Sequence, residues 1–335
     1  MIVTYDREID LVTRVLGRHG VPPEAASIQA VVLAEGDLRG QHSHGLQRLP
    51  IIVQRIVNGL TDPHAVPVAR WVSESFLAID GGRGLGPVVA FDVVDLLVRR
   101  ADDVGLAVGA VHNSNHLGML ASYVERIAAA GQIGLVLTTS EALVHPWGGS
   151  RAMVGTNPIA IGVPTEREPF VLDMSTGAAS RGKILAYARD SRPLPDGWAV
   201  DADGAPASDA SRAVDGAISP FGGPKGYALG LGLELVVASL TGSETGERVL
   251  GTLDAAAVCN KGDLFLVFSP DALGLTAVAK RMGSYLDEVR SSPLAAGASA
   301  IDVPGDRARR LRAERMAEGI PIEDVVWDAA EELMR

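Results

Sequence analysis

Between residues 75 and 268 the chain alternates short apolar runs with glycine-rich turns and helix-like stretches. Six of these runs are typical of β-strands: 75–80, 105–113, 133–139, 159–164, 170–174 and 264–268. Strands that alternate with helical segments form α/β sheets, which bury their apolar side chains under the helices. This part of the chain is therefore predicted to be an α/β domain.

Both ends of the chain show helical periodicity instead. Apolar residues recur at helical spacing in 4–17, 22–39 and 46–57, with Thr4 as an expected N-cap, and charged helical segments occupy 306–318 and 322–334. We expect a helical domain built from 1–74 and 285–335, with an α/β domain, 75–284, inserted between the two parts. The stretch 190–224 is rich in Gly, Pro, Asp and Ser, which predicts a long irregular and functional loop.

Charge and composition exclude several kinds of partner. A formal net charge of −11 disfavours binding to nucleic acid, and one cysteine rules out an internal disulfide or a cysteine-rich zinc site. The N-terminal segment lacks the basic-then-apolar pattern of a signal peptide. The longest apolar run, 228–240, contains Glu234 and is too short to cross a bilayer. We expect a cytoplasmic protein without a membrane segment.

The segment GGRGLG, 81–86, follows a predicted strand and precedes a helix that starts near Pro87. This context suggests a dinucleotide loop, but the Rossmann fingerprint is G-x-G-x-x-G and here the third glycine comes one residue early. A tight turn with proline at the first helical position accounts for the same residues. No cofactor is assigned to this loop.

The segment HSHGLQR, 42–48, is open to three interpretations: a metal pair, a catalytic acid/base, or the capped start of a helix. Metal is disfavoured, because neither a cysteine nor a nearby carboxylate is available as a third ligand. Ser43 is expected to cap the third helix and so to orient His44. Arg48 would lie one turn further along the same face, where its forked guanidinium suits a carboxylate. His42 is given no role.

Two further segments carry candidate groups. In HNSNHLGML, 112–120, a strand is predicted to end and a helix to open at His116, and ligands bind at such strand ends in α/β sheets. A histidine there can transfer protons near neutral pH, or it can simply fill the turn. In GGPKGYALGLGLEL, 222–235, Lys225 falls in the first turn of a helix, where it either meets an anion or is solvated.

Together these segments resemble the type 2 malate/L-lactate dehydrogenase family over nearly the whole chain. This family includes ureidoglycolate, sulfolactate and diketogulonate oxidoreductases and cyclic-imine reductases. The resemblance rests on eight motifs in order: SHG with Arg48, NSNHLG, PWGG, GTNP, VLDMSTG with RGKI, DGWAVDADG, GGPKGYALG, and VPG at 303–305. Family members commonly carry PGE at the last motif, and here it is PGD.

The resemblance implies a non-Rossmann mixed sheet that binds NAD or NADP, and a homodimer. It implies that His44 and His116 are catalytic. The substrate would be bound by Arg48, Ser43, Asn115 and Thr156. The cofactor would be lined by Ser140, Asp173, Met174, Ser175, Lys225, Gly305, Asp306 and Arg307.

The expected activity is hydride transfer between a nicotinamide cofactor and a small 2-hydroxy or 2-keto carboxylic acid. His116 is favoured as the acid/base and Arg48 as the carboxylate ligand, while His44 binds the reacting oxygen or donates a proton in reduction; which histidine moves the proton stays open. The first alternative is NADPH-dependent reduction of a cyclic imine carboxylate such as piperideine-2-carboxylate. More remote alternatives are a metal-dependent hydrolase or lyase and a catalytically silent binding protein.

Overall fold

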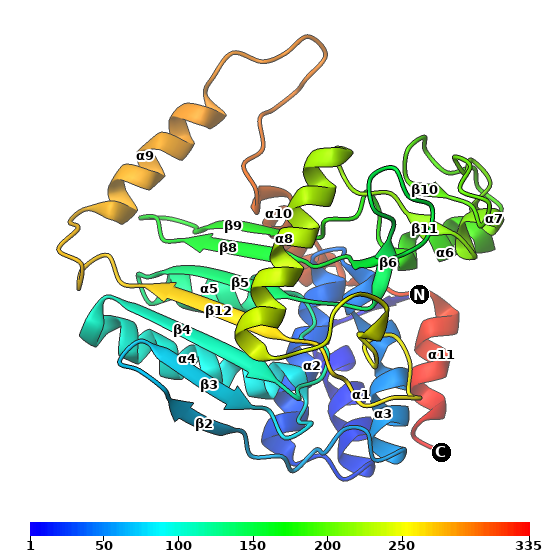
Figure 1. Cartoon of the computed structure of the whole chain (residues 1–335), viewed down its shortest axis with the longest axis horizontal. Helices are drawn as coiled ribbons and strands as arrows, with labels where there is room; N and C mark the ends of the chain where they lie inside the picture. Colours follow the sequence, from blue (N-terminus) through cyan, green and yellow to red (C-terminus); the bar gives the residue numbers. More distant parts are fainter.

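The computed structural model describes residues 1–335 and is built around a seven-stranded mixed sheet (Figure 1). The strands lie in the order β2 (Val68–Trp71), β3 (Phe76–Asp80), β4 (Leu106–His112), β12 (Asp263–Phe268), β5 (Ile133–Thr138), β8 (Ile159–Val163) and β9 (Phe170–Met174). Only β3 and β4 pair in parallel, and every other pair is antiparallel. This order and direction differ from those of the parallel Rossmann sheet.

All six predicted strands are present, and each end lies within one residue of its expected position. Strand β2 was not predicted. It forms the edge of the sheet beyond β3, and its side chains are mostly exposed. An edge strand with one partner does not need the continuous apolar pattern by which the inner strands were recognised.

Helices cover both faces of the sheet. On one face α4 (Gly86–Val104) and α5 (Ala121–Ala129) enclose a core of 21 buried residues, with Tyr123 and Phe265 among the largest. Phe265 stands opposite Gly109 of β4, whose missing side chain leaves room for Leu97 of α4. The neighbouring Leu264 points the other way, toward α8 (Pro224–Thr241), because side chains alternate along a strand.

A smaller four-stranded sheet lies beside α8. Its order is β10 (Ala199–Val200), β11 (Ala217–Ile218), β6 (Ala142–Val144) and β7 (Val154–Gly155), and α6 (Arg181–Arg189) and α7 (Ala210–Val214) complete a core of ten buried residues. The predicted irregular stretch, 190–224, therefore contributes two short strands and one short helix to this unit.

The two ends of the chain share one core. Helices α1 (Tyr5–Arg18), α2 (Pro23–Leu38), α3 (Leu49–Val57) and α11 (Asp324–Glu332) pack together, and β1 (Ile2–Val3) pairs with β13 (Ile320–Pro321). The Thr4 hydroxyl accepts the Arg7 N–H, so Thr4 caps α1 as predicted. Helix α10 (Asp306–Glu318) joins them through an ion pair between Arg312 and Glu35 of α2.

The predicted division into two domains stays a prediction. Its boundary at 284/285 falls inside the continuous helix α9 (Val278–Arg290), which lies near the turn between β8 and β9, with Asp287 paired to Arg167 at 3.7 Å. Figure 1 shows α9 projecting from the rest of the chain. None of the helices is both long enough and apolar enough to cross a membrane.

Candidate active site

Two histidines from distant parts of the sequence stack on each other. His44 ends a 3₁₀ turn, η1 (His42–His44), that follows α2, and His116 lies in the loop between β4 and α5. Their ring centroids are 5.4 Å apart and the ring planes are inclined by 27°. Both rings line a small cavity together with Arg48, Arg55 and Asn115. The structure therefore brings together the two predicted catalytic residues.

The glycine-rich loop 81–86 supports the loop that carries His116. A side chain on Gly86 would come within 2.3 Å of the His116 carbonyl oxygen, and one on Gly81 within 2.9 Å of Ser114. Asn115 completes the contact, because its Nδ2 donates to the carbonyl of Gly84 at 2.9 Å. Close approach of two backbones thus accounts for these glycines. The side-chain amide of Asn115 is already bonded to Gly84 and to Arg55. Its predicted contact with the substrate stays a prediction.

Helix α5 begins at Ala121 rather than at His116 as the sequence analysis expected. Residues 113–119 form an irregular loop, and Asn113 and Gly118 within it adopt φ of +55° and +73°, which interrupts helical geometry. In this loop the Gly118 N–H is free to donate to the His116 ring.

Ser43 was expected to cap the third helix, but it does not. The helix α3 starts at Leu49, and its N-cap residue, Arg48, makes no side-chain capping bond. Gly45 is extended, with φ −93° and ψ −153°, so it separates η1 from a second 3₁₀ turn, η2 (Leu46–Arg48). Proline at position 50 suits the first turn of α3, where its missing N–H has no partner to lose. The Ser43 hydroxyl instead lies 3.0 Å from Nδ1 of His44.

Asp37 of α2 anchors the turn that carries His44. Its Oδ2 accepts the Leu46 N–H at 2.6 Å, and its Oδ1 lies 2.6 Å from Nδ1 of His42. A side chain on Gly45 would collide with this carboxylate. Glu8 is buried next to Asp37, and burial together with that negative charge raises the pKa of Glu8 to about 9, so Glu8 is neutral at pH 7. His42 thus has a structural role that sequence analysis did not assign.

Two arginines reach the same cavity from the start and the end of α3. Arg48 Nη2 donates to the Thr252 carbonyl at 2.7 Å, while its buried Nε has no hydrogen-bond partner. Arg55 is 4% exposed and donates to Asn115 and to two backbone carbonyls, yet its Nη2 also lacks a partner. An unpaired charged donor in the interior is costly, so both atoms favour an anionic ligand. Arg48 was predicted as a site residue from the sequence, and Arg55 was not.

Burial and positive charge set the protonation of the histidines. Burial first, and then the Arg48 charge, lower the pKa of His44 to about 4. Burial also holds the pKa of His116 well below its ordinary value, and Arg48, His44 and Lys261 add to the effect. Both rings are therefore neutral at pH 7.

Hydrogen bonds distinguish the two neutral rings. The Gly118 N–H donates to Nδ1 of His116 at 3.0 Å, so the proton of this ring is assigned to Nε2, which then acts as a donor. The partner of His44 Nδ1 is the Ser43 hydroxyl, which can either donate or accept. The ring of His44 can therefore take up or release a proton at either nitrogen, whereas that of His116 is fixed as a donor.

A short segment of the chain closes the cavity. Gly251 and Thr252 line it, and the Glu141 carboxylate holds this segment by accepting the N–H groups of Thr252 at 2.7 Å and Leu253 at 2.9 Å. The remaining space is about 20 Å³, which is room for about one water molecule. A substrate larger than one water molecule does not fit this space unless the lining residues rearrange.

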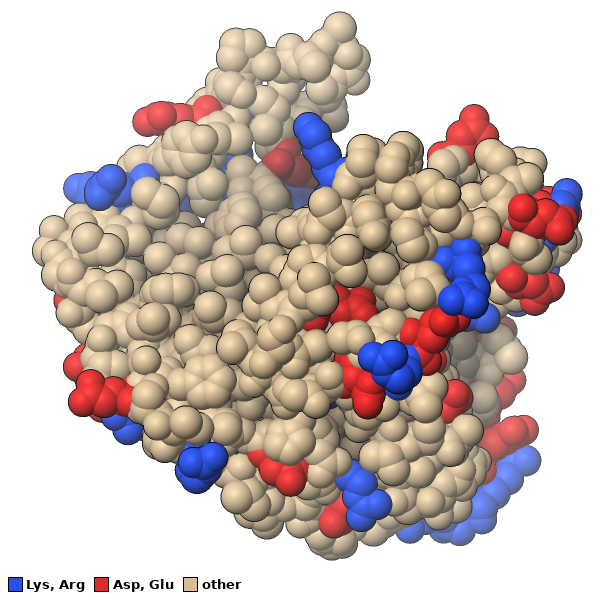
Figure 2. Space-filling view, in the orientation of Figure 1, with Lys and Arg blue, Asp and Glu red and all other residues tan.

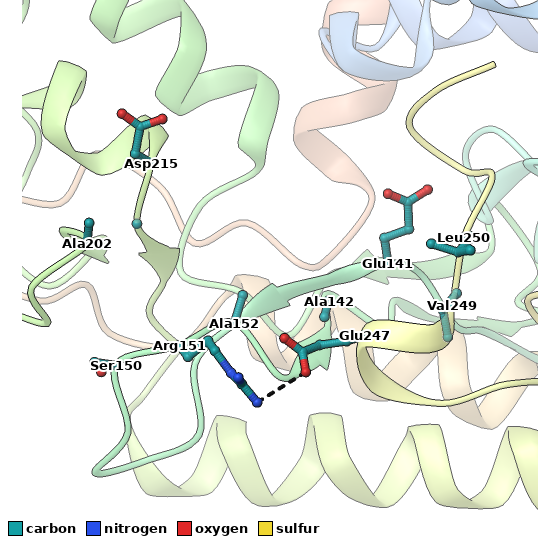
Figure 3. Close-up of a pocket in the computed structure, with 11 residues that line it drawn as sticks. Glu141, Ala142, Ser150, Arg151, Ala152, Ala202, Asp215, Glu247, Val249 and Leu250 are labelled. Carbon is teal, nitrogen blue, oxygen red and sulfur yellow. Dashed lines mark ion pairs between the residues drawn. The ribbon is translucent and has the colours of Figure 1, made fainter. Parts of the chain in front are cut away.

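The same segment forms a wall of a larger cavity of about 500 Å³ (Figure 3). Val249 and Leu250 face it, and Arg151 and Glu247 form an ion pair of 3.1 Å on its side. Figure 3 shows Glu141 beside Leu250, and Glu141 lines this larger cavity. The larger cavity contains no histidine. His44 and His116 both line the smaller one.

Several predicted cofactor residues lie in one neighbourhood beside α8, together with Thr156, which was predicted to bind the substrate. The Ser140 hydroxyl accepts the Thr156 N–H at 2.9 Å, and the Thr176 hydroxyl donates to the Thr156 carbonyl at 2.9 Å. The Phe221 N–H donates to the Thr176 carbonyl, which connects the end of β9 to the start of α8. Ser140, Thr156, Met174, Ser175 and Lys225 therefore belong to adjoining segments.

Two predicted cofactor residues have carboxylates that are already engaged. Asp173 accepts the N–H of Ala121 at 2.8 Å at the start of α5, and burial raises its pKa to about 6. Asp306 is held by Arg290 at 3.0 Å and by Arg309, which keep its pKa far below the ordinary value. These two side chains have structural partners, while the exposed Lys225 and Arg307 stand at the starts of α8 and α10.

The site thus combines a mixed α/β fold, a half-buried stacked histidine pair and two arginine donors without acceptors. The chain belongs to the malate/L-lactate dehydrogenase family, whose sequence model matches residues 3–331. It is therefore an enzyme of the dehydrogenase and reductase class. No three His, Cys, Asp or Glu side chains gather in a geometry that holds a metal ion.

Relatives with different named activities resemble the chain over nearly its full length. The L-sulfolactate dehydrogenase of Methanocaldococcus jannaschii is 37% identical over 99% of this chain and 96% of its own. The pyrroline- and piperideine-2-carboxylate reductase of Pseudomonas syringae is 34% identical over 99% of this chain and 96% of its own. The crystal structure of a dehydrogenase from Sinorhizobium meliloti has a TM-score of 0.96 and 44% identity, over 100% and 98% of the two chains.

Proposed function

We propose that this protein transfers a hydride between a nicotinamide cofactor, NAD or NADP, and a small 2-hydroxy or 2-keto carboxylic acid. The main support is the stacked, neutral pair His44 and His116, which lies next to the unpartnered Nε of Arg48. Such an arrangement offers a proton-transfer group, a hydrogen-bond donor and an anion ligand within one closed cavity.

The hydrogen bonds favour His44 as the group that moves the proton, which reverses the assignment favoured by sequence alone. His44 can accept the hydroxyl proton of a hydroxy acid at a free ring nitrogen and return it to the oxygen of a keto acid. His116 would donate its Nε2–H to the same oxygen, because Nδ1 is occupied by Gly118. Arg48 would bind the carboxylate, and Ser43 would orient His44.

The residues present fit a nicotinamide dinucleotide. Helices α8 and α10 both begin with a glycine at positive φ, Gly223 and Gly305, and neither has a side-chain cap. Uncapped N–H groups beside an exposed cation, Lys225 or Arg307, suit phosphate oxygens. Ser140, Ser175 and Lys225 of the 75–284 segment, together with Gly305 at the start of α10, are proposed to hold the cofactor. When bound, its nicotinamide C4 accepts or supplies the hydride.

Replacing Lys225 with alanine is expected to raise the KM for the cofactor about tenfold and to leave the KM for the keto acid nearly unchanged. One charge-assisted hydrogen bond to phosphate accounts for a change of this size. Steady-state kinetics with each substrate varied in turn measures both values. Equal changes in the two KM values would remove Lys225 from the cofactor site.

Reduction of a cyclic imine carboxylate is the second candidate, because the Pseudomonas syringae reductase is 34% identical and the same groups can bind one carboxylate and serve an imine nitrogen. Loss of NAD(P)H absorbance, followed with both coenzymes over a panel of 2-keto acids and cyclic imines, separates the candidates. We expect turnover with 2-keto acids. Turnover with imines alone would replace the proposal, and no turnover with either would refute both.

We also propose that the protein is a homodimer that buries the outer face of α8. Leu229, Leu235, Val236 and Leu240 are exposed on this helix, and Figure 2 shows a broad surface with few charged residues over α8 and the neighbouring sheet. Exposed apolar surface of this kind favours association. Light scattering should give twice the mass of one chain for the wild type and for the control Val325→Asp on α11, but a smaller mass for Leu235→Asp. A monomeric wild type would contradict the proposal.

A further inference from the structure

Arg55 lines the cavity with Arg48 but has no role in the proposed chemistry. It lies seven residues after Arg48, which places both on the same side of α3 about two turns apart. Both line the cavity. Burial first, and then the positive charge of Arg55, lower the pKa of Arg48, so the two guanidinium groups are close enough to repel each other.

The contacts of Arg55 fix the position of its guanidinium but leave one of its hydrogen-bond donors without an acceptor. Nε donates to Asn115 at 3.0 Å, and Nη1 donates to the carbonyls of Asp254 at 2.7 Å and Ala257 at 3.1 Å. All three acceptors are neutral, and Nη2 has none. A 4%-exposed cation without any carboxylate partner leaves a charge for a ligand to compensate.

The nearby carboxylates are used elsewhere. Glu141 is close enough to act on Arg48, but the same Oε1 accepts the N–H groups of Thr252 and Leu253. Asp263 is paired with the buried Lys261, so these two charges offset each other. The free donors, Nε of Arg48 and Nη2 of Arg55, belong to two side chains that enter the cavity from different turns of α3.

We propose that Arg55 binds a second acidic group of the substrate, so that the enzyme acts on dianionic 2-hydroxy and 2-keto acids and discriminates against monoanionic ones. This inference rests on the proposed function, in which Arg48 holds the carboxylate next to the reacting carbon. The second group is a carboxylate or sulfonate on the adjoining carbon. The remaining donor of Arg55 then gains its missing acceptor, and the repulsion between the two arginines is relieved.

The test compares oxaloacetate with 2-ketobutyrate, in which a methyl group replaces the second carboxylate. The wild-type protein should show a kcat/KM for oxaloacetate about 30–3,000-fold above that for 2-ketobutyrate, the range typical of truncating one partner of a buried charge pair. In Arg55→Leu this ratio should fall below about tenfold, while Arg55→Lys should retain part of it, because lysine keeps the charge but loses the fork. The surface variant Arg14→Leu should keep the wild-type ratio.

The outcomes separate this inference from the proposed function. If the wild type uses both keto acids equally well, or if Arg55→Leu lowers both equally, Arg55 only anchors the 254–257 segment and the inference is wrong while the proposed function stands. If the wild type reduces other 2-keto acids but neither of these two, the inference is wrong and the proposed function stands. If it reduces none of the keto acids of the panel, both fail. If Arg55→Leu does not fold, the wild-type ratio and Arg55→Lys decide the question.

Discussion

A His44→Gln variant is expected to lose about 10²–10⁴-fold in kcat with either keto acid or hydroxy acid, because glutamine fills similar space but cannot transfer a proton. His116→Gln should remain within about tenfold of the wild type, since the amide N–H can replace a ring N–H that only donates a hydrogen bond. Steady-state kinetics at saturating cofactor measures both variants. The comparison depends on the bond from Gly118 to Nδ1 of His116, which fixes the donor role of that ring.

Thermal unfolding of both histidine variants provides the control, because each removes one ring of a buried stacked pair. Similar melting temperatures with unequal kcat values would attribute the difference to proton transfer. The opposite pattern, with His116→Gln inactive and His44→Gln active, would restore the assignment favoured by the sequence and refute the one drawn from the hydrogen bonds.

An Arg48→Leu variant should lose about 30–3,000-fold in kcat/KM for any 2-keto acid, mostly through a higher KM, because it removes the ligand of the carboxylate that all these substrates share. The KM for the cofactor should stay near its wild-type value. Arg48→Lys should recover only part of the loss, since an ammonium group cannot bind both carboxylate oxygens. These values come from kinetics with each substrate varied in turn.

This pattern differs from the one expected of Arg55. The Arg48 change lowers the rates with oxaloacetate and 2-ketobutyrate together, whereas the Arg55 change lowers mainly the rate with oxaloacetate. Arg48 also donates to the Thr252 carbonyl, so its loss loosens the segment that closes the cavity. A raised cofactor KM with an unchanged keto acid KM would show that Arg48 acts on the cofactor side instead.

The inner strands of the large sheet were predictable because buried strands have continuous apolar patterns with turn residues at their ends. The two histidines were predictable from their motifs. What the sequence could not provide was the local backbone: the extended Gly45 divides the start of the third helix, and the loop 113–119 delays α5 until Ala121. Those backbone details set which ring nitrogen has a partner, and the proposed role of each histidine rests on them.

The missed residues of the site depend on contacts between distant segments. Arg55 reaches carbonyls about 200 positions later, and Glu141 holds Thr252 across more than 100 positions. Asp37 looked like an ordinary residue near the end of a helix, yet it fixes the 42–46 turn. Only the spacing of Arg55, seven residues after Arg48, was visible in the sequence as a sign that both share one face of α3.

The most direct test of the central claim follows the hydride itself. The wild-type protein is incubated with oxaloacetate and a reduced nicotinamide cofactor that carries deuterium at both C4 positions, and the hydroxy acid product is examined by mass spectrometry and NMR. The proposed function predicts one deuterium per product molecule, located at C2. A product without deuterium from the cofactor, or no hydroxy acid at all across the keto acid panel, would contradict it.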